Sequence, residues 1–124
     1  MLKRVMVVED ERPLRVAAES NLEKNQFEVV TASTAEEAKE ILESGIQIDA
    51  IWLDHYLLGD ETGLDLLCKL RKNKSWQSIP VFAVTNSVGD DKVQSYQVLG
   101  IEKYFVKSNS TMNEIIGSIK EVLS

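Results

Sequence analysis

Five polar side chains stand where short apolar runs of the sequence end. Glu9 and Asp10 follow VMVV, Asp54 follows IDAIWL, Thr85 closes VFAVT, and Lys107 follows YFV. A carboxylate or an ammonium gains nothing from packing at the end of a buried strand, because burial penalises its charge. These positions therefore suggest chemistry, provided that the fold brings them together.

Carboxylates gathered in one place repel each other, and a bound cation or a proton relieves the repulsion. Mg²⁺ fits best, because it prefers octahedral oxygen coordination, keeps several waters and often shares its site with a phosphoryl group. In such a site Asp54 would be the nucleophile, Lys107 a second positive charge, and the Thr85 hydroxyl a hydrogen-bond partner for a phosphoryl oxygen. The product would be an aspartyl phosphate, a mixed anhydride that water eventually hydrolyses.

Each of these residues alone also has a simpler interpretation. Glu9 and Asp10 would favour the dipole of a following helix, and Asp54 would suit an exposed turn. Threonine is frequent at strand ends, and Lys107 would serve as a solvated lysine. Their occurrence together, at the ends of four strands, favours the phosphoryl site.

His55, the only histidine, directly follows Asp54. Side chains alternate beyond a strand end, so we interpret His55 as a loop or rim residue that faces away from Asp54. One histidine without a cysteine cluster argues against a zinc site. Trp52 is predicted to pack in the core, whereas Tyr104 either fills space or rotates between packed and exposed positions.

Strand-like and helix-like segments alternate five times. Short apolar runs occur at 5–8, 27–30, 48–53, 80–85 and 104–106, and apolar residues recur at helical spacing over 13–25, 33–44, 64–72, 91–99 and 112–122. Right-handed βαβ units are the economical arrangement for this alternation. The predicted fold is an α/β, doubly wound, parallel sheet covered by helices on both faces. With the first, third, fourth and fifth strands adjacent, its carboxyl edge would gather the five polar residues.

Local signals predict where several helices begin and end. Ser33 and Glu36 have the spacing of a capping box. Asn25 suits a left-handed cap of the first helix, and Gly45 is placed to stop the second. The inward face of the third helix is predicted to carry Leu64, Leu67, Cys68 and Leu70.

Length and composition predict one globular domain over residues 1–124, with 44% hydrophobic and 27% charged residues. Fourteen basic against twenty acidic residues give a net charge of −6, which argues against binding a DNA backbone or an anionic membrane surface. No apolar run approaches the ~20 residues of a membrane span. Cys68 is the only cysteine, so a reduced, cytoplasmic setting is expected.

The segments VMVVEDERP, IDAIWLDHYLLGDETGLDLL, IPVFAVTNS and GIEKYFVK together resemble the receiver domain of two-component response regulators, over essentially the whole chain. The likeness is to stand-alone, chemotaxis-type receivers. It implies a flavodoxin-like three-layer sandwich whose five strands follow the order 2-1-3-4-5. It also implies that Asp54 accepts a phosphoryl group from a histidine kinase or a histidine phosphotransfer protein. The chain would assist its own phosphorylation and dephosphorylation without being an enzyme otherwise.

The same resemblance assigns roles around Asp54. Glu9, Asp10 and Asp54 would hold Mg²⁺ together with the backbone carbonyl of Tyr56. Lys107 would contact the phosphoryl group. These roles match the chemistry that the residue types suggest on their own.

The resemblance also assigns residues to signalling. Thr85 and Tyr104 match the pair whose movement reports phosphorylation to the face made by the fourth helix, fifth strand and fifth helix, where a downstream protein would bind. Tyr56 and Ser87 match positions at which the family varies the lifetime of the phosphorylated state.

Three positions depart from the family pattern. Ser108 follows Lys107 where the family usually has a proline, often after a cis bond. Asn86 stands where Ala or Gly is usual, and Leu58 replaces a common proline. The loop to Gly63 is one residue longer than the commonest form. These departures bear on kinetics and loop geometry more than on function.

Other functions fit parts of the pattern. A phosphorylation-independent adaptor would use only its surface, and the retained Asp54, Lys107 and acid pair count against it. A flavodoxin-like cofactor binder needs a loop rich in Gly, Ser or Thr after the first strand, and EDERP has none of these. An aspartate-dependent phosphatase normally has a second acid two residues after the nucleophile, where this chain has Tyr56. Because the chain ends at the fifth predicted helix, we expect protein contacts rather than DNA binding, and a monomer or weak homodimer.

Overall fold

A computed structural model describes residues 2–86 and 89–124 of the chain. Strands and helices alternate along it as the sequence predicts. In chain order the elements are β1 (Arg4–Val8), α1 (Arg12–Lys24), β2 (Glu28–Ala32), α2 (Ala35–Glu43), β3 (Ala50–Leu53), α3 (Gly63–Lys72), β4 (Val81–Thr85), α4 (Asp90–Val98), β5 (Lys103–Val106), the 3₁₀ turn η1 (Lys107–Asn109) and α5 (Met112–Leu123).

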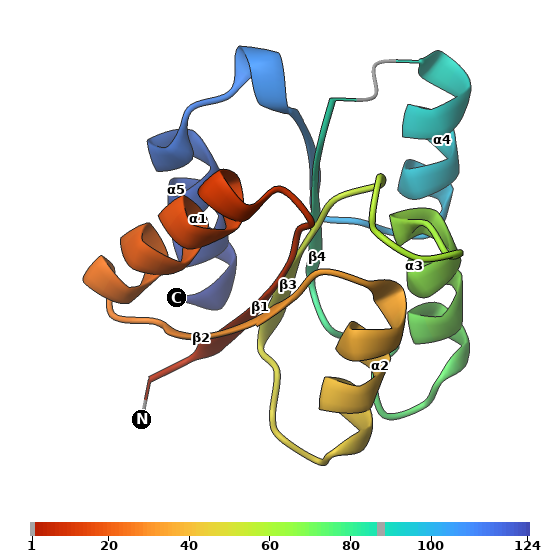
Figure 1. Cartoon of the computed structure of the whole chain (residues 1–124), viewed down its shortest axis with the longest axis horizontal. Helices are drawn as coiled ribbons and strands as arrows, with labels where there is room; N and C mark the ends of the chain where they lie inside the picture. The colour runs from red at the N-terminus through yellow and green to blue at the C-terminus, as the bar shows by residue number, and fades with distance from the viewer. Residues whose placement is uncertain (1, 87–88) are drawn as a thin grey trace.

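The strands form one parallel sheet in the order β2-β1-β3-β4-β5. Helices α1 and α5 cover one face, and α2, α3 and α4 cover the other (Figure 1). The predicted doubly wound, three-layer fold and its strand order are confirmed. Because β1, β3, β4 and β5 run side by side, their carboxyl ends share one edge of the sheet. Within 2–86 and 89–124, no helix is both long and apolar enough to cross a membrane.

Strands β1, β3 and β4 are buried almost throughout, as expected at the centre of a sheet that is covered on both sides. Their side chains alternate between two cores: Met6 and Ile51 lie beneath α2, α3 and α4, whereas Val7 and Trp52 lie beneath α1 and α5. Trp52 is fully buried, so its predicted place in the core is confirmed. A slip of one residue would exchange the two cores, so packing fixes the register in which the carboxyl ends meet.

Helix α2 begins one residue later than the predicted capping box implies. Thr34, rather than Ser33, is the N-cap, and its hydroxyl accepts the N–H of Glu37 at 3.0 Å. The Glu37 carboxylate accepts the N–H and the hydroxyl of Ser33 at 3.1 and 2.7 Å. The predicted Ser33–Glu36 pairing is therefore wrong by one residue. Ala35 sets the frame, because it is buried in the core as the first residue of the helix.

The ends of α1 and α2 follow the predictions closely. The left-handed residue after α1 is Gln26, with φ of 71°, one position beyond the predicted Asn25. Gly45 has φ of 87° and ends α2 as predicted. Two capping boxes that the sequence analysis missed, Thr62 with Asp65 and Thr111 with Glu114, start α3 and α5.

The buried face of α3 is rotated from the predicted one. Leu66, Leu67 and Leu70 are buried, whereas Leu64 and Cys68 are only half-buried. Leucines on neighbouring positions made two stripes equally plausible by spacing alone. Packing against the sheet selects the stripe that includes Leu66.

Candidate functional site

The register of the sheet brings the predicted site residues to one edge. Val8 pairs with Leu53, so the residues that follow them, Glu9 and Asp54, leave the sheet side by side. At the neighbouring strands Thr85 pairs with Val106, the residue before Lys107. The predicted convergence at the carboxyl edge is confirmed for all four strand ends.

Three carboxylates meet at this edge. Glu9, Asp10 and Asp54 each offer an oxygen that lies within 4.8 Å of the others. Glu9 is fully buried and Asp54 is 2% exposed, whereas Asp10 is half-buried. Asp54 Oδ1 accepts the backbone N–H of Tyr56 at 3.4 Å, which leaves this oxygen weakly held.

The ammonium of Lys107 bridges Glu9 and Asp54 and also contacts Glu11. Its Nζ lies 3.0 Å from Asp54 Oδ2, 3.2 Å from Glu9 Oε2 and 3.2 Å from Glu11 Oε1. Burial alone would lower the pKa of Lys107, but the hydrogen bond to Asp54 and the charges of Asp54 and Glu9 raise it to about 12. Lys107 therefore carries a permanent positive charge, yet one ammonium faces three carboxylates.

The effect of the excess negative charge is clearest at Glu9. Its Oε1 lies 3.1 Å from the Lys107 ammonium, but among the described residues it has no hydrogen-bond partner. Burial, followed by the charge of Asp54, raises the pKa of Glu9 to about 7. A buried carboxylate oxygen that has an ion-pair contact but no hydrogen bond, in a cluster with two other carboxylates, fits a site for a divalent cation with oxygen ligands.

The backbone before α1 is held by a residue that the sequence analysis did not select. The guanidinium of Arg15 donates to the carbonyls of Glu9 and Asp10 at 3.1 and 3.4 Å. Glu9 Oε2 also accepts the N–H of Glu11 at 3.1 Å. Arg15 lies on the first turns of α1, and its spacing of five and six residues from the acids was the available signal. It orients the acid pair without placing its own charge among the carboxylates.

His55 lies in the loop after β3, which agrees with the loop alternative of the prediction, but it is buried rather than at the rim. It is 6% exposed, and its Nδ1 lies 2.8 Å from the hydroxyl of Tyr96, a fully buried residue of α4. The rim alternative is wrong because the segment after Asp54 turns inward beneath α4. Burial, followed by the charge of Lys92, lowers the pKa of His55, and burial raises the pKa of Tyr96. The hydrogen bond therefore joins two neutral groups.

Thr85 and Tyr104 flank this region. Thr85 is fully buried, and the half-buried ring of Tyr104 lies edge-on to the ring of Tyr96, with centroids 5.7 Å apart. Ser87 lies outside the described residues. Tyr56 is 53% exposed, and Lys92 donates to its hydroxyl at 3.3 Å and lies 5.1 Å from its ring centroid.

The departures from the family pattern have local explanations. The described residues contain no cis peptide bond, and Ser108 lies within the 3₁₀ turn Lys107–Asn109. The N–H of Leu58, which a proline would lack, donates to the carbonyl of Ser33 at 3.3 Å. Gly59 takes a left-handed conformation, with φ of 87°, in the lengthened loop. Asn86 is exposed.

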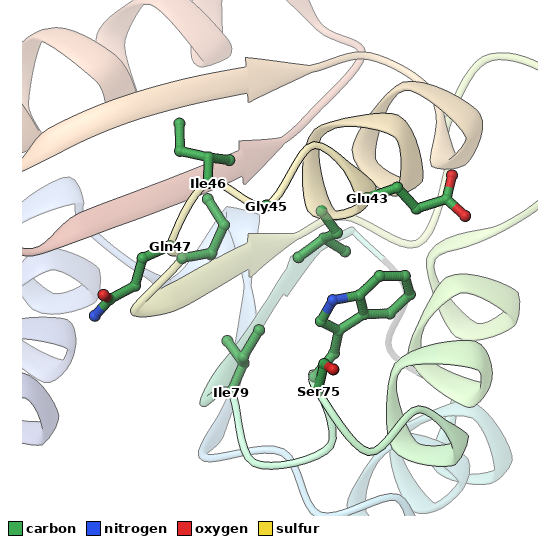
Figure 2. A pocket seen from close by; sticks show the side chains of 9 residues that line it. Glu43, Gly45, Ile46, Gln47, Ser75 and Ile79 are labelled. Atoms are coloured by element: carbon green, nitrogen blue, oxygen red, sulfur yellow. The ribbon is translucent and has the colours of Figure 1, made fainter.

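A separate cavity of about 450 Å³ lies away from these residues (Figure 2). It is formed between the end of α2 and the segment that joins α3 to β4, beside Trp76 and Ile79. Glu43 and Gln47 lie at opposite ends of it rather than converging (Figure 2). None of the predicted site residues lines it, so the carboxyl edge remains the candidate site.

Residues 5–120 match the family described as the response regulator receiver domain. The chain is 32% identical over 124 residues to PhoB, the phosphate regulon transcriptional regulatory protein of Escherichia coli K12, covering 99% of this chain and 52% of PhoB. It is 32% identical over 104 residues to AlgB, the alginate biosynthesis transcriptional regulatory protein of Pseudomonas aeruginosa, covering 84% of this chain and 22% of AlgB. The chain thus spans about half of one relative and about a fifth of the other.

Solved structures give the same result. A CheY-like receiver domain protein of Methanospirillum hungatei JF-1 has a TM-score of 0.89 at 25% identity, covering 99% of this chain and 94% of that one. The chemotaxis protein CheY4 of Vibrio cholerae shares the fold, with a TM-score of 0.87 at 20% identity over 98% of this chain and 99% of that one. The sequence match, the strand order and the acid cluster at the carboxyl edge agree, and the chain belongs to the response regulator receiver domain family.

Proposed function

We propose that this receiver domain accepts a phosphoryl group on Asp54 from the phosphohistidine of a histidine kinase or a histidine phosphotransfer protein. One observation carries the proposal: the Asp54 carboxylate lies 3.0 Å from a largely buried ammonium and within 4.8 Å of two further carboxylates. In the transfer, a carboxylate oxygen of Asp54 forms a P–O bond as the P–N bond of the donor breaks. The electron pair of that bond leaves with the imidazole nitrogen, which takes up a proton.

The proposal includes a Mg²⁺ site. Glu9, Asp10 and Asp54 would supply carboxylate oxygens, and Tyr56 would supply its backbone carbonyl. Two observations support this assignment: Oε1 of Glu9 is buried without a hydrogen bond, and the carboxylates outnumber the ammonium. When bound, the ion would offset the charge of the acids and of the phosphoryl oxygens.

Lys107 and Thr85 complete the proposed site. The Lys107 ammonium already lies 3.0 Å from Oδ2 of Asp54, where it would hold a phosphoryl oxygen after transfer. Thr85 is buried at the end of β4, on the strand between β3 and β5. We propose that the Thr85 hydroxyl binds the phosphoryl group. We also propose that Thr85 moves together with Tyr104 to report phosphorylation. Hydrolysis of the aspartyl phosphate would return the domain to its starting state.

The proposed output is a change in protein contacts on the α4–β5–α5 face. PhoB and AlgB are transcriptional regulatory proteins, of which this chain matches only a part. For the receiver itself the net charge of −6 argues against direct contact with DNA. We propose a cytoplasmic domain that acts as a monomer or weak homodimer and binds a downstream protein.

The test measures intact mass after incubation with acetyl phosphate and Mg²⁺. The wild-type chain should gain one phosphoryl group, and Asp54→Asn should gain none, because an amide is not a nucleophile here. Asp60→Asn, which removes an exposed acid of the same loop, is the matched control and should behave as wild type. Phosphate uptake by Asp54→Asn would overturn the assignment of the acceptor.

A phosphorylation-independent adaptor is the competing function. An adaptor of this kind would give no reason to keep three clustered carboxylates, because their mutual repulsion costs stability. A wild-type chain that binds neither phosphate nor Mg²⁺ would favour the adaptor.

A further inference from the structure

Two successive residues after the proposed acceptor are attached to helix α4. His55 is buried and forms a hydrogen bond of 2.8 Å with the hydroxyl of Tyr96. Tyr56 is exposed and accepts a hydrogen bond of 3.3 Å from Lys92. One contact is therefore sealed in the core, and the other is open to solvent. Hydrogen bonds in a buried setting are the more costly to lose.

Helix α4 depends on Tyr96 more than on any other of its residues. Tyr96 is the one residue of α4 that is fully buried, whereas Val98 is 78% exposed. The helix begins at Gly89 without a side-chain cap. A helix with so narrow an apolar face gains little from packing, so the position of Tyr96 determines that of the helix.

The segment after Asp54 has almost no freedom beneath Tyr96. The N–H of Gly63 donates to the carbonyl of His55 at 2.9 Å. A Cβ at Gly63 would lie 2.1 Å from the Asp54 carbonyl oxygen and 2.9 Å from the Tyr96 hydroxyl. Glycine is therefore required, and the Tyr96 hydroxyl closes the space above it. The backbone of Asp54, the ring of His55 and helix α4 form one packed unit.

We infer that Tyr96 is a positioning residue for phosphoryl transfer: through the buried hydrogen bond to His55 it fixes the segment 54–56 and couples the acceptor directly to helix α4. This inference rests on the proposed function, and it adds a second connection beside the pair Thr85 and Tyr104. The segment it fixes carries the acceptor carboxylate and the proposed carbonyl ligand of Tyr56. Loosening that segment should slow phosphate gain and free α4 at the same time.

The test compares variants that remove the hydrogen bond from either side. Tyr96→Phe keeps the ring and loses the hydroxyl, and His55→Phe loses the ring nitrogen. His55→Asn keeps a hydrogen-bonding group near the position of Nδ1 and serves as the conservative rescue. Ser95→Ala is the matched control, because it removes a neighbouring hydroxyl of α4 that donates to the carbonyl of Asp91 within the same helix.

Three quantities are measured at a temperature where circular dichroism shows every variant folded. They are the rate constant of phosphate gain from acetyl phosphate with Mg²⁺, the rate constant of phosphate loss, and amide hydrogen exchange across α4. Tyr96→Phe and His55→Phe should each slow phosphate gain by about three- to tenfold and speed exchange in α4 by a similar factor, as expected from the loss of one hydrogen bond. The double variant should be no slower than either single variant, and His55→Asn and Ser95→Ala should stay within about twofold of wild type.

The outcomes separate this inference from the proposed function. If wild type gains no phosphate, the proposed function fails and the inference falls with it. If wild type gains phosphate and Tyr96→Phe matches it in rate and in α4 exchange, the inference alone fails. Effects that multiply in the double variant would also overturn it, because they would show two independent roles.

Discussion

Two of the partly buried cations, Lys107 and Arg71, lie at opposite edges of the sheet and are satisfied in different ways. At the carboxyl edge Lys107 faces three carboxylates, and one carboxylate oxygen of Glu9 has no hydrogen-bond partner among the described residues. At the other edge the half-buried guanidinium of Arg71 donates to four backbone carbonyls, of Leu99, Gln77, Ile79 and Gly100, at 2.7–3.2 Å. One cation is surrounded by excess charge and the other by neutral dipoles.

This difference distinguishes a residue of a functional site from a residue that only stabilises the fold. Neutral carbonyls complete the hydrogen bonds of Arg71 and leave no net charge, so Arg71 joins α3 to two loops and needs nothing further. At the carboxyl edge several carboxylates surround the single ammonium of Lys107, so that edge is stable only with a proton or another cation. The cavity beside Trp76 and Ile79 is lined by one carboxylate, that of Glu43, rather than by a cluster of them, which is why we do not assign it chemistry.

Arg71→Met should give the largest loss of stability. It leaves four carbonyls without their donor, and the free energy of unfolding should fall by about 2–4 kcal/mol. The loss should be nearly the same at pH 5.5 and pH 8 and with or without Mg²⁺, because the acceptors of its hydrogen bonds are carbonyls, which do not titrate. Urea unfolding measures it, with the exposed neighbour Lys72→Met as the control. Recovery of stability on adding Mg²⁺ would contradict the contrast between the two edges.

Lys107→Met should show the opposite dependence on conditions. At pH 8 without metal, Glu9 and Asp54 lose the ammonium that pairs with them, and stability should fall by about 1–3 kcal/mol. At pH 5.5 the loss should be smaller, because Glu9 can take a proton instead. Mg²⁺ should stabilise this variant more than wild type, since the competing cation has gone. Equal losses at both pH values would show that Lys107 matters by packing rather than by charge.

Glu9→Gln should stabilise the metal-free protein. The pKa of Glu9 is raised by burial to about 7 in the folded state against 4.5 ordinarily, so the folded state binds its proton more tightly than the unfolded state. The tighter binding of this proton stabilises the folded state fully below pH 4.5, and the stabilisation is lost as the pH rises to about 7. At pH 8 the glutamine variant should therefore be more stable by about 1–2 kcal/mol, with no difference at pH 4.5.

Mg²⁺ provides the control for that substitution. It should stabilise wild type at pH 8 and have a much weaker effect on Glu9→Gln, which lacks one proposed ligand. If Glu9→Gln instead loses stability at pH 8 without metal, the Glu9 carboxylate is already satisfied in the metal-free protein, and the unbalanced charge that we assign to this edge is wrong.

Glu28→Gln should have the smallest effect. Arg4 and Glu28 form an ion pair of 2.8 Å, but the side chain of Glu28 is 49% exposed. Such pairs contribute less than about 0.5 kcal/mol, because solvent screens them. Thermal unfolding at low and high salt checks this value. A loss above about 1 kcal/mol would mean that exposure is a poor guide to which charges matter in this molecule.

The sequence predicted the parts of the site that the sheet alone determines. The site residues stand at or directly after the ends of four adjacent strands, so the topology that the alternating pattern predicts also places them: Glu9, Asp54, Thr85 and Lys107. The contact between His55 and Tyr96 was missed, because it joins residues 41 positions apart. Tyr96 lies on a helix with few apolar residues, where spacing gives little signal.

Side-chain contacts to the backbone could not be predicted from the sequence either. The hydrogen bonds of Arg71 were not predicted, because its carbonyl partners lie in loops whose path no side-chain pattern specifies. Gly63 was recognised as a loop residue, but its approach to the Asp54 carbonyl depends on how that loop folds back. The fold and the charges were predictable, whereas the packing that positions them was not.

The most direct test of the proposed acceptor site is the dependence of phosphate gain on the divalent cation. The intact mass of the wild-type chain is followed after acetyl phosphate is added, once with Mg²⁺ and once with EDTA. We predict one phosphoryl group with Mg²⁺, located at Asp54 by peptide mapping, and none with EDTA over the same time. Equal phosphate gain in both samples, or a phosphoryl group on another residue, would contradict the claim that the unbalanced carboxylates form a cation-dependent acceptor site.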